Sequence, residues 1–180
     1  MARLSAVYCL QDLKEYIEKE IASGIKLLKE KHNSDMPDEY VNPYVGLVTL
    51  PHKNFMPVNF QVPHILIGLV SGHNEPSKEN TISVRLQCAV YGGDVQFKED
   101  MNLPDETGYI SLINLQERII EKLTQAAVIG NCVIDQSFDW GIYDEDLTYP
   151  YWYGYIQFSI DIPTTNRQKP RDFLDDLLNF

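Results

Sequence analysis

The sequence predicts an α+β protein, because the pattern of a strand and the pattern of a helix follow one another in residues 81–123. From Ile82 to Val90 every second side chain is apolar, which is typical of a strand with one face on a core. From Leu112 to Leu123 the apolar side chains recur every three or four residues, as along one side of a helix. We expect this apolar side of the helix to pack on the even-numbered face of the strand.

A second amphipathic helix is predicted at residues 4–30, where Lys and Glu fill the face opposite an apolar row. The row is spaced by three or four positions and consists of Leu10, Leu13, Ile17, Ile21, Ile25 and Leu28. Gly24 lowers the helix propensity and is expected to bend or end the helix. We interpret the apolar row as core-facing, and a partner-binding helix is the alternative.

Two further strands are predicted between these helices. Residues 45–50 form a short strand that Pro51 ends, and residues 62–70 form a longer one. Its continuous apolar run, Ile65-Leu66-Ile67, is typical of a central strand that is buried on both faces. The intervening segment is expected to be a loop or hairpin arm that exposes three apolar side chains, Phe55, Met56 and Phe60.

The link between the strand at 82–91 and its helix contains a turn signal and a start signal. Gly92 and Gly93 turn the chain, since glycine reaches positive φ without a steric penalty. Ser111 is expected to cap the first free amides of a helix at residues 111–126.

The last third of the domain is predicted to return to the sheet. Residues 128–134 form a strand at the sheet edge, and residues 139–146 form an acidic, aromatic loop or hairpin tip. Residues 151–162 form a clear strand, with one apolar face and one amphipathic face that carries Tyr151, Tyr153 and Tyr155. We expect this strand to run antiparallel to residues 128–134.

Length and charge restrict the class of protein. The 180 residues suit one domain, at 1–163, followed by an extension at 164–180 whose helical period predicts a short docking helix. The net charge of −11 argues against non-specific binding to nucleic acid or to an anionic membrane, because both select Lys and Arg. No apolar run approaches the roughly 20 residues of a membrane span. The three cysteines form no CxxC motif, so buried, reduced thiols are expected.

No pattern in the chain predicts an enzyme. The four histidines and three cysteines have no metal-ligand spacing, and Asp144-Glu145-Asp146 lacks the glycine of a calcium loop. No nucleotide-binding or nucleophile motif occurs, so we expect no cofactor, no metal and no catalytic residue. A small hydrolase with an unfamiliar site is the alternative, with Asp135, Asp139 and Asp144 as its first candidates.

Four segments, in this order, resemble one known family. They are Pro63-His64-Ile65-Leu66-Ile67, the alternating strand Ile82 to Tyr91, Gly108-Tyr109-Ile110-Ser111-Leu112-Ile113-Asn114-Leu115, and Ile160-Asp161-Ile162-Pro163. Together they resemble the tail terminator (tail completion) proteins of tailed bacteriophages and prophages, over about residues 5–163. Another neck or head-completion protein is the alternative within this class.

The resemblance implies a mixed, mainly antiparallel sheet of about four to five strands with two helices packed on one face. It also implies a virion protein that forms a ring, usually of six copies, at the head-proximal end of the tail tube. Such a ring stops tube polymerisation and joins the tail to the head connector, after assembly in the host cytoplasm. The implied partners are copies of the chain, the tail tube protein and a connector or neck protein, with DNA only passing through the lumen.

A ring needs apolar contact surface and a lumen that does not retain DNA. The candidate interface residues are Phe55, Met56, Phe60, Tyr151, Tyr153, Tyr155, Phe173, Leu177 and Phe180. The candidate lumen-lining acidic residues are Asp94, Glu99, Asp100, Asp105 and Glu106. The alternatives are that the tyrosines close the subunit's own core and that the carboxylates are merely solvated. An acidic DNA mimic is the rival function, although basic and acidic residues are mixed along the first helix.

Overall fold

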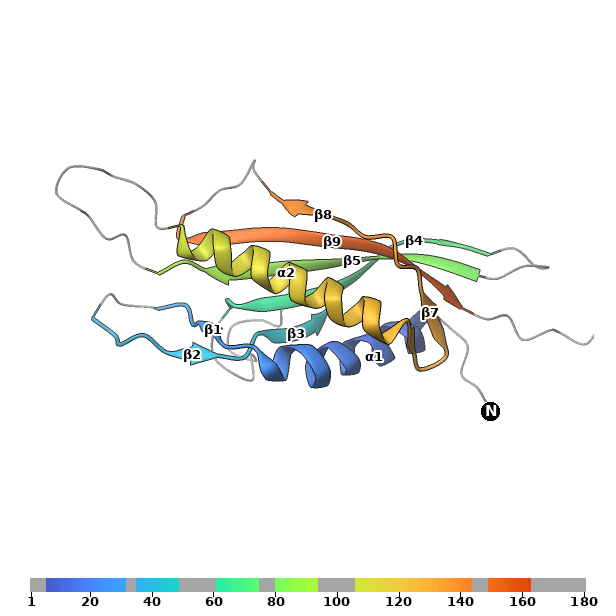
Figure 1. Ribbon diagram of the computed structural model, residues 1–180, viewed down its shortest axis with the longest axis horizontal. Coiled ribbons are helices and arrows are strands. Elements are labelled where there is room, and N and C mark those ends of the chain that lie inside the picture. Colours follow the sequence, from blue (N-terminus) through green and yellow to red (C-terminus); the bar gives the residue numbers. More distant parts are fainter. Residues whose placement is uncertain are drawn as a thin grey trace, which may run out of the picture.

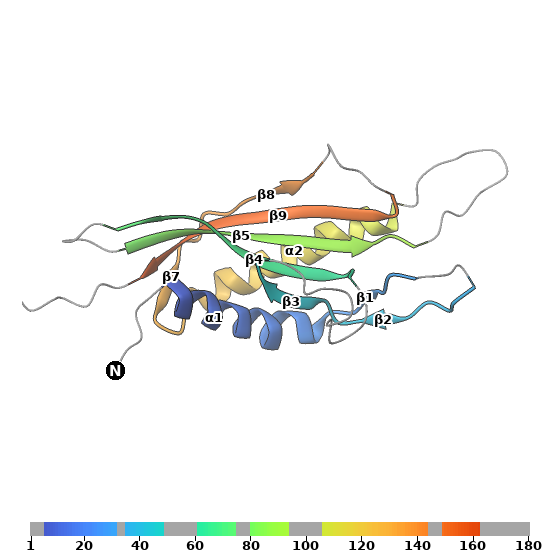
Figure 2. The same ribbon diagram turned by 180° about the vertical axis from the view of Figure 1, so that it is seen from behind.

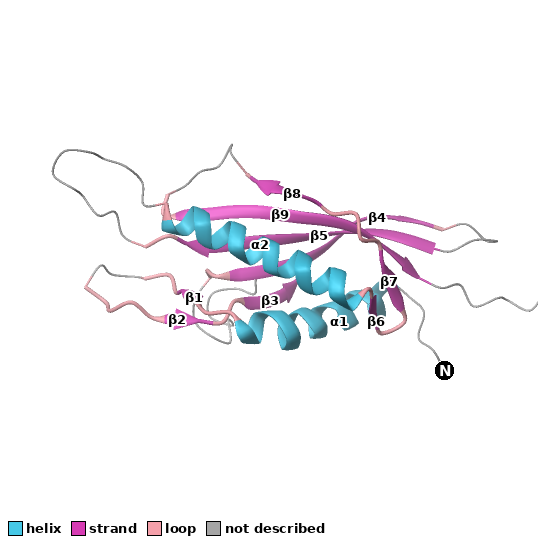
Figure 3. Cartoon of the chain, viewed as in Figure 1, coloured by secondary structure: helices cyan, strands magenta, loops and turns pink. Residues whose placement is uncertain are grey.

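The computed structural model describes residues 6–31, 35–48, 61–74, 80–93, 106–143 and 149–162. A long sheet carries two helices on one of its faces (Figures 1 and 3). The elements are α1 (Ala6–Tyr16), continued by a π-helical turn (Ile17–Ile21) and a 3-10 turn (Ala22–Gly24), then β1 (Leu27–Leu28), β2 (Tyr40–Val41), β3 (Tyr44–Leu47), β4 (His64–His73), β5 (Asn80–Tyr91), α2 (Thr107–Ala126), β6 (Val128–Ile129), β7 (Cys132–Ile134), β8 (Asp139–Ile142) and β9 (Tyr151–Ile162).

The predicted α+β class, with a mixed and mainly antiparallel sheet, is confirmed. The main sheet has the strand order β3-β4-β5-β9-β7-β6, with β8 also paired to β9, and β1 and β2 form a separate pair. Only β3 and β4 run parallel among these described strands.

The number of strands was predicted too low, because the main sheet has seven strands instead of four to five. The segment 128–134 is a hairpin and not one strand, since Gly130 adopts a φ of +61° between β6 and β7. Residues 139–142 pair with β9 as β8, where a loop or hairpin tip was expected. The expected antiparallel pairing of 128–134 with the last strand is confirmed at β7.

The helices cover the even-numbered face of β5, as predicted. Leu112, Leu115, Ile119 and Leu123 of α2 share one buried cluster with Ile82, Val84, Leu86, Cys88 and Val90. Cys9, Leu13, Ile17 and Ile21 of the first helical segment join the same cluster, and Tyr16 donates a hydrogen bond to the Lys122 carbonyl of α2 at 3.1 Å. Figures 1 and 2 show that both helices lie on this side and that the reverse side presents strands. The core-facing interpretation of the first helix is therefore correct.

The first helix ends earlier than predicted. The helical turns stop at Gly24, and Ile25 is already extended, at φ −117° and ψ 136°. The side-chain amide of Asn42 donates hydrogen bonds of 2.7–3.0 Å to the carbonyl groups of Ala22, Ser23 and Ile25, so these carbonyls are satisfied without another helical turn. Leu28, which was assigned to the helix, lies in β1 and packs on the opposite sheet face.

The second helix begins earlier than predicted. It starts at Thr107, so Ser111 lies within the helix and does not cap it. Gly108 explains the earlier start, because a Cβ there would lie within 2.6 Å of both the Trp152 ring and the Gly92 Cα. The absence of a side chain lets the first turn of α2 sit directly against β9 and the end of β5.

Candidate interaction face

The sheet face opposite the helices carries the tyrosines that the sequence singled out. Along β9 the even-numbered side chains from Gly154 to Ile162 are buried, whereas the odd-numbered ones from Tyr151 to Asp161 are half-exposed. Each odd-numbered residue pairs across the sheet with an odd-numbered residue of β5, so both strands point these side chains to the same face. No helix of the described chain packs on this face (Figure 2).

Tyr151 and Tyr153 are partly engaged inside the subunit. Tyr151 donates a hydrogen bond of 2.9 Å to Oε1 of Glu30, and its ring centroid lies 5.7 Å from that of Tyr91. Burial, followed by the hydrogen bond with Glu30, raises the pKa of Tyr151 to about 12. Both tyrosines border a small buried cluster of Val62, Ala89 and Tyr91. For these two, the structure contains the core-closing contacts that the sequence left open as an alternative.

Tyr155 instead lies beside a positive charge. The Arg85 guanidinium carbon is 5.7 Å from the centre of the Tyr155 ring, a cation–π distance. Nε and Nη2 of Arg85 both donate to Oε1 of Gln157, at 3.1 and 2.8 Å. Among the described residues Arg85 has no ion pair with a carboxylate. Two neutral neighbours therefore orient a cation whose charge is not neutralised within the described part of an acidic chain.

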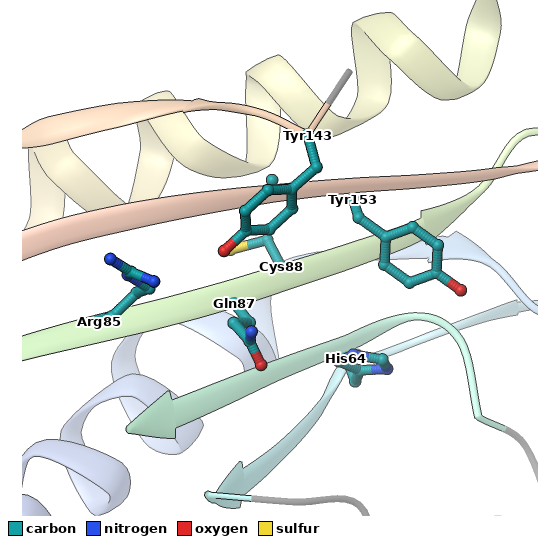
Figure 4. A pocket seen from close by; sticks show the side chains of 7 residues that line it. His64, Arg85, Gln87, Cys88, Tyr143 and Tyr153 are labelled. Carbon is teal, nitrogen blue, oxygen red and sulfur yellow. The ribbon is translucent and has the colours of Figure 1, made fainter. Parts of the chain in front are cut away.

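Arg85 and Tyr153 border an open hollow of about 550 Å³ on this face (Figure 4). His64, Gln87 and Tyr143 complete most of its lining. The hollow therefore offers aromatic walls, one cation and amide groups. This combination can bind an apolar side chain together with a carboxylate.

Among the described lining residues, His64 and Cys88 are not arranged as a catalytic pair. His64 is 7% exposed, and its Nδ1 lies 2.5 Å from the Gln61 carbonyl oxygen, while burial lowers its pKa. Cys88 also borders the hollow, but its side chain belongs to the core on the helix side, and burial raises its pKa to about 12. A neutral histidine and an un-ionised thiol on opposite faces of the sheet do not form a nucleophile–base pair.

Gln116 supports one wall of the hollow from beneath. This α2 residue is fully buried, and Nε2 donates to the carbonyl groups of Gly141 on β8 and Tyr155 on β9, at 2.9 and 3.0 Å. A Cβ at position 154 would lie 2.6 Å from that nitrogen, so Gly154 provides the space for the amide. The contact joins β8 to β9 just before Tyr143. Its signal in the sequence is an amide on the apolar side of a helix.

Most of the other predicted site residues lie outside the described residues. These are Phe55, Met56, Phe60, Phe173, Leu177 and Phe180 of the interface set and Asp94, Glu99, Asp100 and Asp105 of the lumen set. Glu106 is described, and it is exposed immediately before α2. The structure thus brings together only the three tyrosines, and sequence reasoning missed Arg85, Gln116 and Gln157 beside them.

The hydrolase candidates Asp135 and Asp139 border one small hollow of about 270 Å³. Serine side chains line it with them, and its described lining includes no histidine, lysine, arginine or cysteine. Oδ1 of Asp135 accepts a hydrogen bond of 3.2 Å from the Ser137 amide, as in a local turn. Asp144 lies outside the described residues. In the part of the chain that is described, no group of three or more potential ligands is placed to hold a metal ion.

Comparison with known proteins adds no assignment: no family model matches the chain, and a search of curated proteins finds no significant match. Neither described helix is both long enough and apolar enough to cross a membrane.

Proposed function

We propose that this protein is a structural protein of a phage tail, of the tail-terminator type. In this proposal, copies of the chain form a ring of about six at the head-proximal end of the tail tube. The ring stops tube polymerisation and binds the head connector, and DNA passes through it without being bound specifically. The support is the ordered set of sequence segments, together with an α+β fold whose two helices lie on one sheet face.

The structural feature that best supports this proposal is the sheet face opposite the helices. Tyrosine and arginine are enriched where proteins contact each other, and here Tyr143, Tyr153, Tyr155 and Arg85 surround one open hollow or its rim. A neighbouring copy is a suitable occupant because each copy has 26 Asp and Glu residues that can offer a carboxylate to Arg85. We therefore assign this face to the contact between adjacent copies.

The DNA-mimic alternative receives less support from the described surface. A mimic of DNA displays carboxylates in rows, free of basic residues. In the first helical segment, Lys14 pairs with Glu18 and Lys19 pairs with Glu15, both at 3.0 Å. Its exposed side therefore alternates in sign.

The decisive measurement is the mass of the purified chain in solution, by light scattering and native mass spectrometry. A ring of six has a mass of 6 × 20.7 kDa, about 124 kDa, and appears as a ring in electron micrographs. It carries 6 × −11 = −66 formal charges, so assembly is expected to improve between low salt and about 0.15 M salt as repulsion is screened. A chain that stays monomeric over this salt range, and that does not bind phage tail tubes, would contradict the proposal.

Arg85→Glu tests the assigned face. The substitution replaces attraction to a neighbour's carboxylates by repulsion, so we expect at least a tenfold weaker association, by about 1.4 kcal/mol. Arg118→Glu is the matched control, because Arg118 is an exposed residue of α2 on the other side of the sheet and undergoes the same charge change. Equal effects of the two variants on ring mass would show that net charge, and not this face, controls assembly.

A further inference from the structure

Two of the three cysteines meet in the core although they are far apart in the sequence. Cys9 lies on α1 and Cys132 begins β7, and each thiol is close enough to the other to influence its pKa. Both are free and buried, at 2% and 6% exposure, and both belong to the main hydrophobic cluster. We propose that Cys9 and Cys132 are a redox-active pair that oxidises to a disulfide bond and thereby links α1 covalently to the β6–β7 hairpin.

The backbones around the two thiols are also in close contact. Asp12, three residues after Cys9, lies so close to Gly130 that a Cβ on this glycine would collide with its carboxylate. Gly130 is the turn residue of the hairpin that continues into Cys132. Asp12 and Asn131 also border one common hollow. Figures 1 and 3 show the corresponding arrangement, with the start of α1 beside β6 and β7. The thiol contact is therefore part of an extended helix–hairpin contact.

Cys88 provides an internal comparison. It lies on β5, is 1% exposed, and belongs to the same buried cluster, but burial is the only influence on its thiol. Neither of the other two thiols influences its pKa. Burial and reduced state are therefore common to all three cysteines, whereas mutual contact distinguishes Cys9 and Cys132.

The reaction requires an oxidant, for which hydrogen peroxide is sufficient. The interaction between the two thiols lowers the pKa of Cys132 and raises the pKa of Cys9, so it favours the thiolate of Cys132 over that of Cys9. The Cys132 thiolate attacks one peroxide oxygen, which gives a sulfenic acid and hydroxide, and the hydroxide takes up the proton that Cys132 released. The Cys9 sulfur then attacks the sulfenic sulfur, and water leaves with the Cys9 proton. In total, two thiols and one peroxide give one disulfide and two waters.

The buried environment makes this oxidation slow in the native protein. Burial is the main cause that raises the pKa of both thiols, and the Asp12 carboxylate, which faces both, acts in the same direction. Since the thiolate is the attacking species, we expect the pair to react over hours of exposure and not within seconds. The disulfide is therefore expected to form only under lasting oxidising conditions.

The test uses the full-length chain, reduced and then exposed to hydrogen peroxide at neutral pH without denaturant. Remaining thiols are alkylated in denaturant, and the intact mass and the cross-linked peptides are measured. We expect the wild type to lose two alkylation sites and two hydrogen atoms, with one peptide pair that joins Cys9 to Cys132. Cys88→Ser should behave like the wild type, whereas Cys9→Ser and Cys132→Ser should form no intramolecular link.

Thermal unfolding gives a second readout that does not depend on the substitutions. The link closes a loop between positions that differ by 132 − 9 = 123 residues, so the oxidised wild type should melt several degrees above the reduced form, and dithiothreitol should reverse the shift. The proposal is overturned if the native wild type keeps three alkylatable thiols, if oxidation stops at sulfinic acid on one cysteine, or if the link involves Cys88.

Discussion

Replacing Gln116 by Leu tests how α2 holds β8 on the sheet. Gln116 is fully buried, and its amide nitrogen donates to the Gly141 and Tyr155 carbonyl groups. Its Oε1 is buried without a hydrogen-bond partner. Leucine has a similar volume and no polar atom, so the substitution alters polar contacts more than packing.

The expected loss follows from the number of polar atoms affected. Two partly buried carbonyl groups each lose a donor, at about 1–3 kcal/mol per group, while removal of the unpartnered Oε1 returns about 1–3 kcal/mol. The net result is a destabilisation of about 1–3 kcal/mol. The stability lost with the two donated hydrogen bonds is therefore larger than the stability gained by removing the unsatisfied oxygen.

The measurement is chemical unfolding, combined with hydrogen exchange of the β8 amides. Gln125→Leu is the matched control: it lies on the same helix, is exposed, and bonds only to Glu121 at 3.0 Å, so its effect should stay within about 0.5 kcal/mol. The β8 amides should exchange faster in Gln116→Leu alone. If Gln116→Leu were as stable as the wild type with unchanged exchange, the amide would not contribute to holding β8 against β9.

Two further predictions concern residues of β9. Gly154→Ala should destabilise the fold by more than about 2 kcal/mol in urea unfolding, because the new Cβ would lie 2.6 Å from the Gln116 amide nitrogen. The control is Gly24→Ala, which should be neutral or slightly stabilising because a Cβ there meets nothing within 4 Å. Equal effects of the two substitutions on stability would refute the packing argument. Tyr151 has a folded-state pKa raised from 10.0 to about 12, so its contribution to stability is complete below pH 10 and lost between pH 10 and 12. Tyr151→Phe, compared by thermal melting with Tyr143→Phe, should therefore weaken this alkaline decline, and an unchanged decline would show that the Tyr151–Glu30 bond is not its source.

Much of the fold followed from local periodicity. The alternation in β5 and β9 and the apolar side of α2 were predicted with the correct faces, because a residue's face depends only on its position within its own element. The errors lie at element ends. Gly24 was correctly identified as the end of the first helix, whereas Ser111 was wrongly predicted to cap the second. Contacts with Asn42 and Trp152, both distant in sequence, set where the helices end and begin.

The candidate site was only half predictable. The tyrosine row follows from alternation within one strand, but Arg85 and Gln157 meet only because β5 and β9 pair in one particular register. The alternation within a strand predicts which of its residues share a face, but it does not predict which residue of another strand lies opposite each of them. Arg85 was visible as a cation on the outward face of an alternating strand, yet its neutral partners were not.

The sequence by itself determined the class of the fold, the two sheet faces and the acidic character of the chain, since periodicity and charge are properties of single segments. Tertiary structure alone decided the hollow beside Arg85, the polar contact of Gln116 and the meeting of Cys9 with Cys132. The physical reason is that each of these depends on strand register and helix placement, which the cooperative packing of one core fixes for the whole chain at once.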